Sequence, residues 1–259
     1  IRLDGADHII LDSLNIVGSG GTYSWGIHHI NQADSNVIKR SVIDMSAATS
    51  TTAANTGGIV VSNSNTSATT QGSNANYLQI IDNEIIGAYR GIIIYGSTGA
   101  TNGKDHLIEN NTIRDFYADG IVLLHTDSAR VIGNDIHRAN RAAVGAFAGI
   151  ELGGDAQRTL VMNNRIHDTH NSATAQGGTA NGLLSSTNDV APGVENYFIN
   201  NVIYNFNSTT GIQYGIYNNS SNGARYYHNT VSLDNQTSTS GTTRGIYLNS
   251  TTTTPTSNV

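Results

Sequence analysis

The sequence element that decides the fold occupies residues 111–121 and reads Asn-Thr-Ile-Arg-Asp-Phe-Tyr-Ala-Asp-Gly-Ile. Its two ends, an Asn-x-Ile triplet and a Gly-Ile pair, alternate along the chain, with eight copies of each. The triplets, the first two degenerate and the last ending in Val, are Leu14–Ile16, Ser41–Ile43, Asn83–Ile85, Asn111–Ile113, Asn134–Ile136, Asn164–Ile166, Asn201–Ile203 and Asn229–Val231. The pairs, one of them Gly-Leu, begin at Gly26, Gly58, Gly91, Gly120, Gly149, Gly182, Gly215 and Gly245. Such self-similarity is typical of a repeat protein.

Each unit offers two or three short strands, because β-branched and aromatic runs such as Leu107-Ile108 and Tyr197-Phe198-Ile199 precede the Asn. One unit cannot bury its apolar face alone, whereas units stacked strand on strand at ~4.8 Å bury a continuous interior. We expect the Asn side chains to form an amide ladder and the Gly to supply permissive backbone angles at a corner. The predicted inward ladders are Ile85, Ile113, Ile136, Ile166, Ile203 and Val231, and Ile92, Ile121, Ile150, Leu183, Ile216 and Ile246.

The composition excludes several classes of protein. Only 12% of the 259 residues are charged, the formal net charge is -6, and there are no cysteines. Duplex nucleic acid is therefore not an expected partner, and a disulfide scaffold or a Cys-based metal site is excluded. The absence of an apolar run of 18 residues predicts no membrane insertion.

The repeat resembles the right-handed parallel β-helix of pectin-lyase-like proteins. This resemblance implies an all-β, single-stranded parallel β-helix (solenoid) of about eight coils over residues 1–259, a single domain that we expect to be part of a longer chain. Phrases such as Tyr214-Gly215-Ile216-Tyr217-Asn218-Asn219 also resemble large secreted surface proteins of Bacteroidetes-type bacteria. The resemblance implies an extracellular location, with neighbouring domains or protomers at the open β-helix ends, where strand edges are unpaired.

Enzymes among the pectin-lyase-like proteins that this repeat resembles carry motifs that are missing here. The hydrolases have an Asp-Asp pair, Gly-His-Gly and Arg-Ile-Lys, and none of the three occurs in this sequence. The lyases need a general base and a partner for the uronate carboxylate, either Ca²⁺ held by acids or basic side chains. The only lysines are Lys39 and Lys104, so Arg or His would have to serve.

The candidate site lies in residues 104–170, which hold 7 of the 13 Lys and Arg and 5 of the 9 His. Residues that follow the inward Ile point outward, so stacked coils place Ile86, Arg114, His137, His167 and Tyr204 in one outer column. Asp135 and Arg165 lie in the column beside it. Glu151 follows Gly149-Ile150 and is the only acid in its own outward column. As a lyase site, Arg114 and Arg165 would bind the carboxylate, with His137 or His167 as the base; otherwise the charges pair across the coils of a solvated face.

The outward position after Gly-Ile is unexpectedly apolar. Either loops fold over this strip, or it contacts a partner chain or sugar rings. The strip contains Val60, Ile93, Val122, Leu184, Tyr217 and Tyr247.

We expect a non-catalytic extracellular or cell-surface module with a structural, adhesive or assembly role that contacts a polysaccharide. The alternative is a polysaccharide lyase acting on an acidic polysaccharide. No metal site and no cofactor are expected, with Ca²⁺ considered only for a lyase. The expected binding residues are Arg114, Asp135, His137, Glu151, Arg165, His167 and Tyr204.

Overall fold

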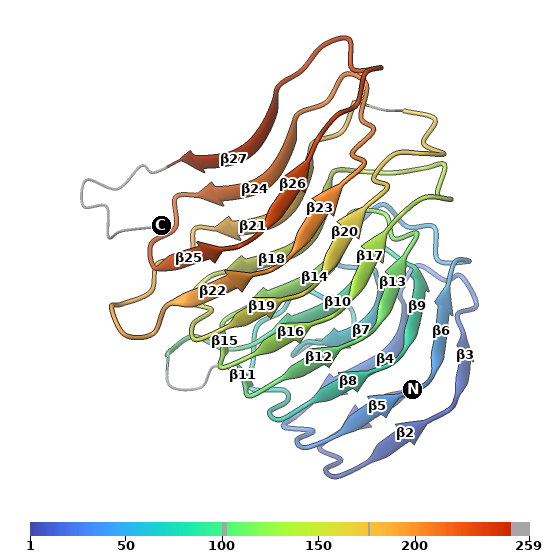
Figure 1. Ribbon diagram of the computed structural model, residues 1–259. Coiled ribbons are helices and arrows are strands. Elements are labelled where there is room, and N and C mark those ends of the chain that lie inside the picture. The colour runs from blue at the N-terminus through green and yellow to red at the C-terminus, as the bar shows by residue number, and fades with distance from the viewer. Residues whose placement is uncertain (100–102, 176, 250–259) are drawn as a thin grey trace.

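The computed structural model describes residues 1–99, 103–175 and 177–249 (Figure 1). Three parallel sheets run along the molecule, and the chain passes from one to the next in every coil. The described chain is therefore a parallel β-helix of about eight coils, as the repeat predicts. No helix long and apolar enough to cross a membrane occurs in these residues.

Each sheet takes one strand from every coil. The first sheet contains β1 (Arg2–Asp4), β4 (Ser24–Ile30), β7 (Thr56–Val61), β10 (Arg90–Tyr95), β14 (Asp119–Leu124), β18 (Phe147–Gly153), β21 (Ala180–Ser186), β24 (Gln213–Asn219) and β27 (Thr243–Asn249). The second contains β2 (Ile10–Asp12), β5 (Val37–Lys39), β8 (Gln79–Ile81), β12 (Leu107–Glu109), β16 (Arg130–Ile132), β19 (Leu160–Met162), β22 (Asn196–Ile199) and β25 (Ala224–Tyr227). The third contains β3 (Asn15–Val17), β6 (Val42–Met45), β9 (Glu84–Gly87), β13 (Thr112–Arg114), β17 (Asp135–His137), β20 (Arg165–His167), β23 (Val202–Tyr204) and β26 (Thr230–Ser232). A small ribbon pairs β11 (Gly103–Lys104) with β15 (Thr126–Asp127).

The inward ladders are formed in the predicted register. Ile113 pairs with Ile85 and Ile136 in the third sheet, and Ile121 pairs with Ile92 and Ile150 in the first. All six of these side chains have no exposed area. Val231 and Ile246, in the last described coil, are the exceptions: Val231 is half-buried and Ile246 is 58% exposed, because β26 and β27 each have a neighbouring strand on one side and no described strand on the other.

The Asn ladder is also present, at the turn between the second and third sheets. The Asn134 Oδ1 accepts hydrogen bonds from the backbone N–H and the Nδ2 of Asn111, both at 3.0 Å, and the pattern repeats from Asn83 to Asn229. Ser41 continues the ladder, because its N–H donates to Asn83 and its Oγ accepts from Leu14. Stacking thus satisfies buried polar groups that no coil could satisfy alone.

The Gly of each Gly-Ile pair has a different role from the one predicted. None of these glycines has a positive φ, so permissive backbone angles are not what the position requires. A Cβ on Gly120 would instead lie 2.6 Å from the carbonyl oxygen of Gly149 and 2.6 Å from Cγ2 of Ile136. The position requires glycine because a neighbouring coil and an inward Ile occupy the space.

The apolar strip on the first sheet divides into two parts. Val60, Ile93 and Val122 are at most 1% exposed and pack with Ala68 of the loop after β7, so loops cover the strip here as one alternative predicted. Tyr217 and Tyr247 are half-buried and stack on each other, with ring centroids 5.2 Å apart.

Candidate functional site

The predicted outer column lies on the third sheet. Successive strands pair Ile86 with Arg114, Arg114 with His137, His137 with His167, and His167 with Tyr204. The flanking column aligns Asp135 between Thr112 and Arg165. The structure therefore brings together six of the seven predicted binding residues: Arg114, Asp135, His137, Arg165, His167 and Tyr204.

The rings in this column stack on one another. The imidazoles of His137 and His167 are 5.0 Å apart at 19°, and the His167 ring is 4.8 Å from Tyr204 at 13°. Because each ring covers its neighbour's face, the column presents ring edges to solvent.

His167 is fixed by two carboxylates. Its Nε2 lies 2.8 Å from Asp135 Oδ1, and its Nδ1 lies 2.6 Å from Asp168 Oδ2. Burial alone would lower the pKa of His167, but the hydrogen bonds to Asp135 and Asp168 outweigh it and raise the pKa. Asp135 also accepts a hydrogen bond from Arg165 at 2.6 Å. Despite its partial burial, the pKa of Asp135 is lowered by His167 and Arg165.

His137 has the opposite protonation tendency. Burial and the charge of neighbouring His167 lower its pKa, so the imidazole is neutral at neutral pH. Its Nδ1 is buried and has no hydrogen-bond partner among the described residues. The two histidines of the column are therefore not equivalent as candidate bases.

Arg114 is held between two acidic groups. Its Nε donates to Glu84 at 2.8 Å and its Nη1 to Asp115 at 2.9 Å. These carboxylates outweigh the effect of burial and raise the pKa of Arg114. The guanidinium is thus oriented as well as charged.

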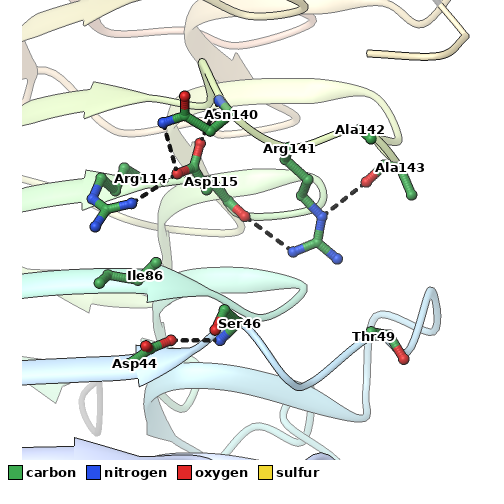
Figure 2. A pocket seen from close by; sticks show the side chains of 10 residues that line it. All are labelled: Asp44, Ser46, Thr49, Ile86, Arg114, Asp115, Asn140, Arg141, Ala142 and Ala143. Atoms are coloured by element: carbon green, nitrogen blue, oxygen red, sulfur yellow. Dashed lines mark hydrogen bonds and ion pairs between the residues drawn. The ribbon is translucent and has the colours of Figure 1, made fainter. Parts of the chain in front are cut away.

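A pocket of about 480 Å³ opens beside Arg114 (Figure 2). Its lining comes from β6 and the loop after it, from β9, from the end of β13 and from the loop after β17. The lining residues are Asp44, Ser46, Thr49, Ile86, Arg114, Asp115, Asn140, Arg141, Ala142 and Ala143. The pocket therefore spans several coils along the same outer face as the column.

A buried arginine holds the loop that forms one wall of the pocket. Arg138 has no exposed area and donates hydrogen bonds to the carbonyl oxygens of Tyr117, Gly145, Ala146 and Thr169. Burial lowers the pKa of its guanidinium to about 9. These bonds fix the course of residues 138–146, and with it the position of the pocket wall.

Sequence reasoning did not assign two charged groups of the pocket, Asp44 and Arg141. Asp44 pairs with Ile86, so extending the predicted column one coil towards the N-terminus would have found it. Arg141 lies in a loop whose course the repeat does not define. Glu151, grouped with the binding residues, lies on β18 of the first sheet, between Val122 and Leu184. Burial raises its pKa to about 7.

No group of three or more His, Asp or Glu residues in the described part of the chain could hold a metal ion.

No protein-family model and no curated protein matches the chain. Among solved structures, the fold is similar to the A-module of the Azotobacter vinelandii mannuronan C-5 epimerase AlgE4, with a TM-score of 0.52 and 15% identity. The match covers 94% of this chain and 58% of that one, so the chain spans less than two thirds of that module. At this identity the similarity shows the fold alone.

Two further structures are more distant. The A-module of AlgE6 from the same organism has a TM-score of 0.46 and 14% identity, over 96% of this chain and 76% of that one. The periplasmic alginate epimerase AlgG has a TM-score of 0.44 and 14% identity, over 86% of this chain and 47% of that one. The resemblance to surface proteins of Bacteroidetes-type bacteria stays a prediction.

Proposed function

We propose that this chain is a non-catalytic β-helix module that binds a polysaccharide along the outer face of its third sheet. One observation carries the proposal: the basic side chains of this face, apart from His137, are held by carboxylates. Arg114, Arg165 and His167 each contact at least one carboxylate within 2.9 Å. A face whose charges are fixed in this way is a rigid recognition surface, because little side-chain freedom is left to lose on binding.

The same pairing is unfavourable for catalysis by His167 and by Arg165 in the flanking column. A general base needs a free lone pair within reach of the substrate proton, and both ring nitrogens of His167 already contact carboxylates. Arg165 shares Asp135 with His167. These residues therefore suit binding better than proton transfer.

A polymer fits the shape of the face. The column and the pocket lie on consecutive coils, so from Asp44 to Tyr204 they follow the axis over five strand spacings, roughly 24 Å. The name of the epimerase module with a similar fold also refers to a polysaccharide, mannuronan. Secretion, a cell-surface or adhesive role, and neighbouring domains or protomers at the solenoid ends belong to the same proposal.

The second candidate is a polysaccharide lyase for which His137 is the base. The neutral state of His137 favours it, because a neutral imidazole can accept a proton. Arg114 and Arg165 would then bind the uronate carboxylate. His167 is the weaker candidate base, because Asp135 and Asp168 favour its protonated form.

Incubation with a panel of acidic polysaccharides separates the two functions. The binding module retards one or more polymers in affinity electrophoresis and forms no unsaturated uronate, which is detected by its ultraviolet absorbance. Unsaturated product that disappears on His137→Ala, while Tyr204→Ala retains it, would show the lyase instead. Retardation of no polymer in the panel would contradict the binding proposal.

A further inference from the structure

The pocket beside Arg114 has a polarised lining. Arg114 and Arg141 lie on one side, together with Asp115, whose carboxylate accepts hydrogen bonds from Arg114 and Asn140. Asp44 and Ser46 lie on the other side, and Ile86 lies between them (Figure 2). Asp44, Ile86 and Arg114 are consecutive rungs of one column, so the acidic and basic sides are about two strand spacings, ~10 Å, apart. The ligand must therefore present an anionic end and hydrogen-bonding groups across that span.

The guanidinium groups of Arg114 and Arg141 each keep N–H donors that make no hydrogen bond to the described residues. Arg141 donates from Nε to the carbonyl oxygen of Ala143 at 2.8 Å, and from Nη1 to the carbonyl oxygens of Ala88 and Asp115. Arg114 uses its Nε and Nη1 for Glu84 and Asp115. Among the described residues, neither Nη2 has a hydrogen-bond partner. Two oriented guanidinium edges of this kind match a carboxylate.

The opposite side can accept hydrogen bonds. Asp44 Oδ1 accepts the backbone N–H of Ser46 at 2.9 Å, whereas Oδ2 has no partner among the described residues. The hydroxyls of Ser46 and Thr49 also line the pocket. This set of groups suits sugar hydroxyls, which both donate and accept.

The centre of the pocket is apolar. Ile86 is half-buried, and Ala142 and Ala143 are exposed at the rim. Apolar walls with a few placed polar groups are typical of small-molecule sites. A pyranose ring has the same two aspects, a C–H face and polar edges.

We propose that this pocket binds one hexuronate unit of the polysaccharide, with its carboxylate on Arg114 and Arg141 and its hydroxyls towards Asp44. The inference rests on the proposed function and names the sugar class. The chain carries a net charge of -6, so recognition depends on these two guanidinium groups rather than on the overall field, which repels an anion.

Calorimetric titration of the full chain with a hexuronate trisaccharide and with its carboxyl-reduced, neutral counterpart tests the assignment. We expect the acidic trisaccharide to bind at least tenfold more tightly than the neutral one. Arg114→Gln and Arg141→Gln should each weaken its binding at least tenfold. Arg130→Gln, the same charge change on an exposed residue of β16, should leave the affinity unchanged.

Loss of the loop hydrogen bonds could unfold the Arg141 variant, so Ala143→Glu provides a second route. It places a carboxylate at the exposed rim and should also weaken binding at least tenfold. Equal affinity for the acidic and the neutral trisaccharide, or wild-type affinity in both Ala143→Glu and Arg114→Gln, would overturn the assignment. If a polysaccharide binds while these pocket variants have no effect, only the pocket assignment fails; if no polysaccharide binds, the proposed function fails.

Discussion

At the scale of single residues, Asn134 shows how a side chain of one coil satisfies the next. Its Oδ1 accepts two hydrogen bonds from Asn111, and its Nδ2 donates to the Ile108 carbonyl oxygen at 3.0 Å and to Asn164 Oδ1 at 2.9 Å. Since Asn134 is 1% exposed, water cannot replace these bonds.

Asn134→Ala should lower the free energy of unfolding by about 2–4 kcal/mol, because it leaves more than one buried polar group without a partner. Urea denaturation followed by circular dichroism measures the change. Asn134→Ser is the matched variant, since Ser41 occupies the same ladder one turn from Asn83. Its loss should be smaller, and equal losses would show that the amide ladder is not the source of the stability.

Two histidines in the interior make stability depend on pH. His29 and His106 have no exposed area, and their ring nitrogens have no partners among the described residues. Burial lowers the pKa of His29 to about 3 and that of His106 to about 4. Both side chains are therefore neutral in the folded protein.

Unfolding returns both histidines to a pKa near 6.5, so the unfolded chain binds more protons below that pH. Stability should therefore fall as the pH drops from 6.5 towards 4, by up to ~1.4 kcal/mol per pH unit for each histidine. Denaturation midpoints between pH 4 and 7 test this. His106→Leu should reduce the slope, whereas His228→Asn, at an exposed position with positive φ, should leave it unchanged. An unchanged slope in His106→Leu would contradict the argument.

At the scale of strands, Glu151 is the one acid in the outward row of β18 and its neighbours. It lies between Val122 and Leu184, and burial raises its pKa from 4.5 to about 7. The folded protein therefore keeps this proton up to about pH 7, while the unfolded chain releases it near pH 4.5.

Glu151→Leu should stabilise the protein at pH 8 relative to wild type by up to ~3 kcal/mol, because the wild-type chain loses stability as the pH rises from 4.5 towards 7. The gain at pH 4.5 should be much smaller, since the wild-type carboxyl is protonated there in the folded state. Chemical denaturation at the two pH values measures the difference. An equal gain in stability at pH 4.5 and pH 8 would show that packing, and not ionisation of Glu151, causes the gain.

The close approach at the Gly-Ile pairs gives a sharp prediction for two strands of the first sheet. Gly120→Ala in β14 should destabilise by about 1–3 kcal/mol, because its Cβ would meet Gly149 and Ile136 at 2.6 Å. Gly245→Ala in β27 is the control, since nothing lies within 4 Å of its Cβ. Thermal melts of both variants test this, and equal effects would contradict the steric account.

Much at the strand scale could be predicted from the sequence. The period of the Ile residues determines which side chains share a column, so the alignment of Arg114, His137 and His167 could be predicted from the sequence. The position of Arg141 could not be predicted, because it depends on the course of the loop after β17. That course is fixed by hydrogen bonds from Arg138 to carbonyl oxygens, which the repeat does not reveal. The contact between His167 and Asp168 could not be predicted either, because it depends on the local course of the chain directly after β20, where the Asp168 side chain turns back towards His167.

At the scale of the whole molecule, the solenoid presents its side chains at a regular spacing along its axis. Its parallel strands repeat at ~4.8 Å, and the pocket and the ring column occupy consecutive rungs of the same outer face. A polymer that lies along the axis can therefore meet the pocket at Asp44 and Arg114 and the ring edges at His137, His167 and Tyr204. A single sugar contacts only part of this surface, so longer chains should bind more tightly than short ones.

The central claim is that the protein binds an acidic polysaccharide and leaves it intact. The most direct measurement follows bound polymer and polymer length in one sample, with the wild-type chain and Arg114→Gln at equal concentration. Our account predicts that the wild type retains the polymer at constant length, that no unsaturated ends appear, and that Arg114→Gln retains less of it. Shortening of the polymer by the wild type, with unsaturated ends that vanish on His137→Ala, would contradict it.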